Sequence, residues 1–157
     1  MPDRVYLETS TISYLAAHPS RDLITAARQQ LTHEWWSRRR RDFEVYVSEI
    51  VIAEAAAGDA DAARRRAQWM EGIPSLKISD EATALAGQLV RAARLPDRAA
   101  VDALHISLAA CCGMQYLLTW NSTHIANAEF RPRVERACRD GGYEPPALCT
   151  PDELMGV

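Results

Sequence analysis

Short apolar runs alternate with helical patterns along the whole chain, and this alternation limits the possible fold more than any other feature. The runs that predict strands are Val5–Leu7, Phe43–Val47, Leu76–Ile78, Tyr116–Thr119 and Ala147–Cys149. Strands that alternate with helices are typical of a parallel sheet covered by helices on both faces. We therefore expect an α/β protein with three layers, α/β/α, built on a mostly parallel five-stranded sheet.

Capping residues predict where the helices between these strands begin. The expected helices run from Ser20 toward Arg41, from Ser48 to Gly58, from Asp59 to Gly72, from Asp80 (capped by Ser79) to about Arg94, and from Pro96-Asp97 into the segment around Asp102. Thr150-Pro151-Asp152-Glu153 has a cap, a first-turn proline and a capping-box acid, which predicts a short final helix. No repeat or linker interrupts the 157 residues, so we expect one domain, 1–157.

Composition excludes several classes of protein. No stretch approaches the roughly 20 apolar residues of a membrane span, and the charged Asp3 and Arg4 follow Met1 where a signal sequence would need apolar residues. We therefore expect a cytoplasmic protein that does not contact a membrane. The four cysteines lack the spacing of zinc ligands and are expected to be reduced and mostly buried. A net charge of −3 argues against tight nonspecific binding of nucleic acid but allows a local basic patch.

One acidic residue lies inside a helix that is otherwise suited to burial. From Ala99 to Cys112 the residues are apolar or small on every face, apart from Asp102, His105 and Ser107. An unpaired carboxylate in such a place costs on the order of several kcal/mol. Asp102 is therefore expected to pair with an arginine such as Arg98, to accept hydrogen bonds, or to hold a cation.

Other oxygen-bearing side chains occupy places that can converge on Asp102. Glu8 ends the first strand, Glu54 lies in an apolar helix, and Asn121 follows the fourth strand. In open α/β sheets the functional crevice lies beyond the carboxyl ends of the strands, so neighbouring first and fourth strands would bring Glu8 and Asn121 together. Clustered oxygen ligands suit Mg²⁺ or Mn²⁺ better than zinc. The chemistry indicated is hydrolysis of a phosphodiester by metal-activated water.

The same residues resemble the PIN-domain nucleases, and within them the VapC-like toxins of bacterial toxin–antitoxin pairs. The segments that resemble the family are Tyr6-Leu7-Glu8-Thr9-Ser10, Ser48 to Glu54, Asp102-Ala103-Leu104-His105-Ile106 and Leu117-Leu118-Thr119-Trp120-Asn121. The resemblance implies a PIN-like fold and a Mg²⁺- or Mn²⁺-dependent ribonuclease that cleaves RNA. It also implies a small antitoxin protein as partner.

The resemblance assigns roles to four residues in the catalytic and metal site. Glu8, Asp102 and Asn121 are expected to coordinate the ion directly or through water, and Glu54 to hold a second ion or orient the attacking water. Ser10 and Thr119 are implied as hydroxyls beside the site. The family usually has Asp at the positions of Glu8 and Asn121, so a second hypothesis is a PIN-fold binding module with weakened catalysis.

Several side chains have an open interpretation. His105 is expected to be a core histidine or a donor to a site residue, while His124 could meet a substrate phosphate. Glu49 is expected to be structural, because it lies in the first turn of its helix. The arginine run 38–41 ends a predicted helix, where positive charge favours the C-terminal dipole, and the run 64–66 is a solvated helix face; contacts to RNA are the less favoured alternative for both. A phosphorylated receiver domain is a third, weaker alternative.

An interface is expected on the early helices. Tyr14 and one of Trp35 or Trp36 are predicted to form part of an apolar surface there. Only one of the two tryptophans is expected to be exposed, because adjacent helical residues point about 100° apart. Such a surface suits the antitoxin or a second copy of the chain, since two-fold homodimers are the commonest assemblies.

Overall fold

The computed structural model describes residues 1–156 and contains a five-stranded sheet with the strand order β3-β2-β1-β4-β5. All four strand pairings are parallel, which confirms the predicted sheet. The strands are β1 (Arg4–Leu7), β2 (Glu44–Ser48), β3 (Ser75–Leu76), β4 (Tyr116–Leu118) and β5 (Ala147–Cys149). The third strand was predicted at Leu76–Ile78, but it begins one residue earlier and ends at Leu76. The backbone N–H of Ile78 donates instead to the Glu49 carboxylate (2.8 Å), which takes the chain out of the sheet.

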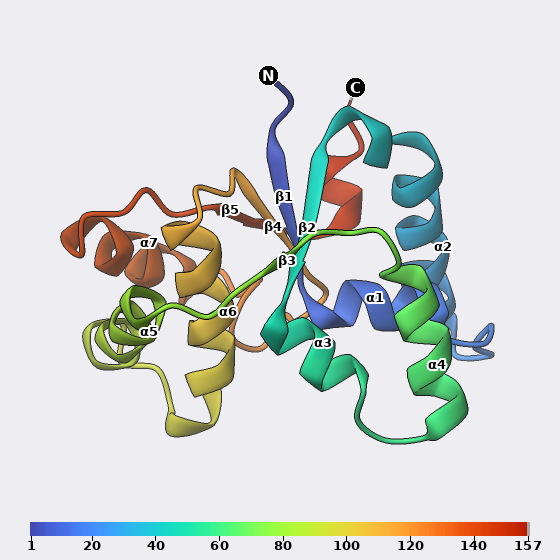
Figure 1. Cartoon of the computed structure of the whole chain (residues 1–157), viewed down its shortest axis with the longest axis horizontal. Coiled ribbons are helices and arrows are strands. Elements are labelled where there is room, and N and C mark those ends of the chain that lie inside the picture. Colours follow the sequence, from blue (N-terminus) through green and yellow to red (C-terminus); the bar gives the residue numbers. More distant parts are fainter. Residues whose placement is uncertain (157) are drawn as a thin grey trace.

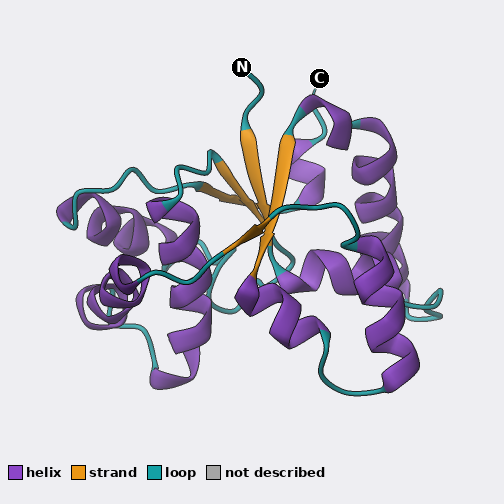
Figure 2. Cartoon of the chain, viewed as in Figure 1, coloured by secondary structure: helices purple, strands orange, loops and turns teal. Residues whose placement is uncertain are grey.

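Helices cover both faces of the sheet, as the three-layer prediction requires. The helices are α1 (Thr9–Ala16), α2 (Leu23–Arg38), α3 (Glu49–Ala55), α4 (Ala60–Trp69), α5 (Asp80–Ala92), α6 (Ala100–Cys111) and α7 (Arg131–Asp140), with 3₁₀ turns η1 (Arg40–Asp42), η2 (Asp97–Ala99) and η3 (Pro151–Leu154). Figure 1 shows α1, α2 and α4 on one side of the strands and α5, α6 and α7 on the other. The same layers stand out in Figure 2, where the strands lie between two groups of helices.

The helix starts follow the capping chemistry at most of the predicted places. The side chains of Ser48, Asp59 and Ser79 each accept a backbone N–H in the first turn of the helix that follows, as expected. The predicted cap at Ser20 is wrong. Its hydroxyl instead accepts the backbone N–H of Asp22 (3.1 Å), and it is Asp22 that caps α2 by accepting from the backbone of Thr25 (3.0 Å).

The hydrophobic core surrounds the central strand and α6. Val5, Tyr6 and Leu7 of β1 are all fully buried. From Ala103 to Ala110 almost every residue of α6 is buried too, which confirms the enclosed helix inferred from its composition. Trp35 is buried and its neighbour Trp36 half-buried, as their 100° separation predicts. The four cysteines are free thiols, two buried and two half-buried. Within residues 1–156 the helices are all too short or too polar to cross a membrane.

The strand order determines where the polar strand ends meet. Successive connections from β1 lead outward to β2 and β3, whereas β4 and β5 lie on the opposite side of β1. This reversal between β1 and β4 is the topological switch point of the sheet, beyond which ligands bind in open α/β folds. Backbone and side-chain bonds tie the two strand ends together. Glu8 N–H donates to the carbonyl of Leu118 (3.0 Å), and Trp120 N–H donates to the Ser10 hydroxyl (2.8 Å).

Candidate active site

Glu8 lies at the end of β1, where it is both buried and held in one orientation. The residue is 5% exposed and caps α1, with Oε1 accepting the backbone N–H of Ser10 (3.1 Å). The same oxygen accepts the hydroxyls of Ser10 and of Thr119 (2.6 Å for Thr119). Within residues 1–156, Oε2 has no hydrogen-bond partner. The hydroxyls of Ser10 and Thr119, which the resemblance placed beside the site, therefore fix one oxygen of the Glu8 carboxylate and leave the other free.

Glu54, on α3, is arranged in the same way. Its Oε1 accepts the Thr9 hydroxyl (2.7 Å) and a ring N–H of His105 (2.6 Å), while Oε2 has no partner in the part of the chain that is described. The hydrogen bond from His105 is the main cause that lowers the pKa of the Glu54 carboxyl, so this group is ionised at neutral pH. Its side chain is 41% exposed, so the group is accessible from solvent.

A buried chain of hydrogen bonds supports Glu54 from behind. The Ser48 hydroxyl lies 2.7 Å from the Tyr6 hydroxyl, which lies 2.6 Å from His105 Nδ1, and His105 Nε2 reaches Glu54. An ionised carboxylate only accepts, so Nε2 bears a hydrogen. Burial raises the pKa of Tyr6, so its hydroxyl keeps its proton and can donate to Nδ1. Every group is satisfied when Ser48 donates to Tyr6, Tyr6 to His105, and His105 to Glu54.

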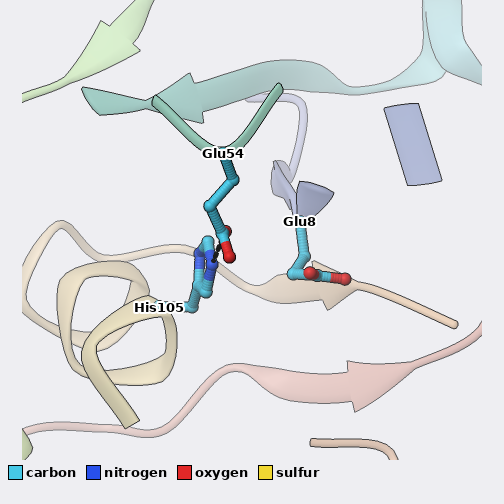
Figure 3. A group of neighbouring side chains, drawn as sticks. All are labelled: Glu8, Glu54 and His105. Atoms are coloured by element: carbon cyan, nitrogen blue, oxygen red, sulfur yellow. Dashed lines mark hydrogen bonds and ion pairs between the residues drawn. The ribbon is translucent and has the colours of Figure 1, made fainter. Parts of the chain in front are cut away.

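The distances place Glu8, Glu54 and His105 in one group. One potential ligand atom from each lies within 4.8 Å of the others, and Figure 3 shows the Glu54 carboxylate against the His105 ring with Glu8 opposite. Because the Nε2 hydrogen already points at Glu54, His105 serves as a donor that positions Glu54. The expectation of a buried histidine with hydrogen-bond partners is confirmed. A role as metal ligand would need the other tautomer.

Asp102 and Asn121 form a second group beside the first. Asp102 Oδ1 accepts the side-chain amide of Asn121 (3.0 Å), and its Oδ2 lies 2.8 Å from His124 Nδ1. Asp102 is therefore hydrogen-bonded, as expected. Its partners are Asn121 and His124 rather than Arg98. The two groups are connected through Thr119, whose hydroxyl accepts the backbone N–H of Asn121 (2.9 Å) while it donates to Glu8.

Both ends of the Asn121 amide are in use. Its Oδ1 accepts the backbone N–H groups of Thr123 (3.1 Å) and His124 (3.3 Å), and its NH₂ group faces Asp102. An aspartate here would put a second carboxylate against Asp102, which is unfavourable without a cation between them. In this arrangement Asn121 orients Asp102. Its role as a ligand stays a prediction.

His124 is a site residue whose function the sequence left open. It is 8% exposed and contacts Asp102, and its ring lies against that of Phe130 with a centroid separation of 6.2 Å. Its Nε2 is buried without a hydrogen-bond partner in the part of the chain that the structure describes. The polar loop after Asn121 was the only signal in the sequence, and it did not reveal that His124 turns back onto Asp102.

The donor set fits a hard divalent cation. In residues 1–156 no arginine or lysine forms an ion pair with Glu8, Glu54 or Asp102; His105 contacts Glu54 and His124 contacts Asp102 through hydrogen bonds. Buried or half-buried carboxylates without cationic partners repel one another, and free carboxylate oxygens are the ligands that Mg²⁺ and Mn²⁺ prefer. Glu8 Oε2 and Glu54 Oε2 are the atoms best placed to hold such an ion.

The fold and the site together define an α/β protein with a parallel sheet and acidic residues at its switch point. The family model of the PIN domain matches residues 5–130, so the chain belongs to the PIN domain family. Divalent-metal-dependent nuclease chemistry is general in this family. A comparison with curated proteins finds no match.

Proposed function

We propose that the chain is a Mg²⁺- or Mn²⁺-dependent endoribonuclease and the toxin component of a toxin–antitoxin pair. The observation that supports it most strongly is the pair of carboxylates at the switch point, each with one oxygen fixed by hydrogen bonds and the other free. Membership of the PIN family supports the reaction class. A divalent ion, when bound, supplies polarisation of the phosphate and activation of water.

The residues of the chain have separate tasks in this proposal. Glu8 and Glu54 hold the ion through their free oxygens, and their buried hydrogen-bond partners keep these oxygens in place. Asp102, oriented by Asn121 and His124, contributes a third carboxylate directly or through water. Side chains that are already held in position lose less conformational entropy when the ion binds.

The test removes carboxylate charge with little change in shape. Glu54→Gln and Asp102→Asn are each expected to abolish Mn²⁺-dependent cleavage of RNA while the protein stays folded, and chelator should do the same to the wild type. Glu49→Gln is the matched control, because Glu49 lies on the same helix and its carboxylate accepts a hydrogen bond from the Ile78 backbone, away from the site residues. Cleavage at the wild-type rate by either site variant in cleaned preparations would contradict the assignment.

A binding module with weakened catalysis is the second candidate, and the Asn121 contacts favour it. An amide oxygen that already accepts two backbone N–H groups is not free to hold an ion. RNA binding by the wild type without metal-dependent cleavage of any RNA would select this candidate.

A further inference from the structure

A basic hollow lies between the end of α5 and α7. It measures about 220 Å³ and is lined by Arg94, Arg133 and Arg136, together with Ala92, Ala137 and Asp140. Figure 1 shows that these two helices lie next to one another in the layer that also contains α6. The three arginines come from segments nearly 40 residues apart in the sequence. Neither arginine run noted in the sequence, 38–41 or 64–66, contains any of them.

The charge around this hollow is opposite to that of the chain. Residues 91–98 and 131–140 contain seven arginines and three acids, although the whole chain has a net charge of −3. Within residues 1–156 only one of these arginines, Arg139, forms an ion pair, and its partner Glu144 lies outside both segments. The lining therefore has a net positive charge, because Arg94, Arg133 and Arg136 outnumber its one acid, Asp140.

A short series of contacts links the hollow to the candidate active site. Asp102 contacts His124, and the His124 ring packs on Phe130. The guanidinium of Arg133 lies 4.7 Å above the centre of the Phe130 ring. His124, Phe130 and Arg133 thus connect Asp102 to the lining of the hollow.

The backbone at Arg94, which lines the hollow, is in a strained conformation. Arg94 follows the end of α5 with φ of 56°, and the Leu95 N–H closes the helix end on the Val90 carbonyl (3.0 Å). Glycine usually occupies this left-handed position, because a Cβ atom is unfavourable there. Arg94 is the only non-glycine residue with positive φ in the described chain.

We propose that Arg94, Arg133 and Arg136 bind backbone phosphates of the single-stranded RNA substrate on one side of the bond that is cleaved. The proposal deepens the nuclease function given above and rests on it. Guanidinium groups match phosphate oxygens in geometry as well as charge. Contacts to phosphates position a strand without reading its sequence, so this site should increase affinity for RNA of any sequence.

The test measures binding and cleavage separately. Binding of a labelled 12-nucleotide single-stranded RNA is measured in chelator at several salt concentrations for the wild type and for Arg133→Ala/Arg136→Ala. The double variant should bind about tenfold more weakly, and its slope of log K against log [salt] should fall by about 1.4, or about 0.7 for each phosphate that is no longer neutralised. With Mn²⁺, the KM of the double variant for the same RNA should rise by a similar factor.

Two further variants distinguish a binding role from a structural one. Arg94→Gly should raise the melting temperature by about 2–4 °C, because strain is relieved, and weaken RNA binding several-fold. Arg38→Ala/Arg41→Ala removes two exposed arginines elsewhere and should bind like the wild type.

Three results would overturn the proposal: binding by the Arg133/Arg136 variant equal to wild type, an unchanged salt slope, or an equal loss of affinity in the Arg38/Arg41 control. If the wild type cleaves RNA and the hollow variants bind normally, only the hollow is refuted. If the hollow variants lose RNA binding but the wild type cleaves nothing, the nuclease function is refuted and the hollow is supported as an RNA site.

Discussion

At the scale of single residues, Glu8 and Glu54 each have one carboxylate oxygen fixed by hydrogen bonds and one that is free, whereas both oxygens of Asp102 are hydrogen-bonded. Glu8 and Glu54 both use Oε1 for hydrogen bonds from buried or half-buried donors. A side chain held in this way loses little further freedom when its other oxygen binds an ion. Their hydroxyl and imidazole partners are therefore as necessary to the geometry as the acids.

Tyr6 is the residue that tests the buried hydrogen-bond chain. Tyr6→Phe removes the hydroxyl that contacts both Ser48 and His105 Nδ1, which leaves two buried polar atoms without that partner. We expect a decrease of about 1–3 kcal/mol in the free energy of unfolding, measured with urea. We also expect a higher Mn²⁺ concentration for half-maximal cleavage, because His105 is freer to turn away from Glu54.

The control for Tyr6 is Tyr46→Phe, on the neighbouring strand. The Tyr46 hydroxyl makes one long contact, 3.4 Å to Glu44, so its removal should change neither quantity appreciably. If Tyr6→Phe leaves the Mn²⁺ requirement at the wild-type value, the hydrogen-bond chain contributes only to the core and does not position Glu54.

Asn121→Asp tests the contact with Asp102. The change adds a carboxylate 3.0 Å from Asp102 Oδ1, so in chelator the variant should unfold at a lower urea concentration than the wild type. Added Mn²⁺ should restore stability, by about 2.7 kcal/mol at a hundredfold excess over Kd. Thermal melts with and without Mn²⁺ measure this shift.

Ser122→Asp adds the same charge on an exposed neighbour and should show neither effect. A wild type with no Mn²⁺-dependent shift, beside an Asn121→Asp variant that gains both the shift and RNA cleavage, would favour the weakened binding module. No change in either measurement for Asn121→Asp would show that this position lies outside the metal site.

At the scale of the elements, apolar periodicity and capping residues were enough to predict the strands and most helix starts. Both signals are local, because burial of a strand and satisfaction of the first N–H groups depend on nearby residues. The helix α7 was not predicted. It has few apolar residues, with only Val134, Ala137 and Cys138 buried, so its pattern resembles that of a polar loop.

The site shows the same division between local and distant information. Glu8, Glu54, Asp102 and Asn121 could be selected because each is a polar residue in an apolar or strand-end setting. The Tyr6–His105 contact could not, since it joins residues 99 positions apart. The hollow at Arg94, Arg133 and Arg136 depends on the packing of α5 on α7, which no local pattern encodes.

Asp22→Ala tests the start of α2 at this scale. The variant leaves the Thr25 N–H without its side-chain acceptor, so the free energy of unfolding should fall by about 1 kcal/mol, measured with urea. Ser20→Ala should have a smaller effect, because Ser20 only supports the turn before the cap. Equal decreases in the two variants would contradict Asp22 as the dominant cap.

At the scale of the whole molecule, the candidate active site and the expected partner surface lie on different elements of the fold. The acids follow the carboxyl ends of the strands, whereas two of the most exposed large apolar side chains are Leu23 and Ile24 in the first turn of α2, 84% and 64% exposed. Trp36, a candidate for this surface from the sequence, is half-buried against Trp69 with Arg40 over its ring. Leu23 and Ile24 are further candidates for an interface on the same early helices.

The last prediction concerns this surface, which we propose is covered by a second copy of the chain or by the antitoxin. Adjacent exposed apolar side chains are typical of protein interfaces, and two-fold dimers are the commonest assemblies. Light scattering should give a dimer mass for the wild type at high concentration, and Leu23→Ser/Ile24→Ser should shift it toward the monomer. Ile78→Ser, an exposed apolar residue beyond β3, is the matched control and should stay dimeric. A wild type that is monomeric at high concentration and co-purifies with no small protein from its native host would contradict both occupants, because nothing would then shield Leu23 and Ile24 from water.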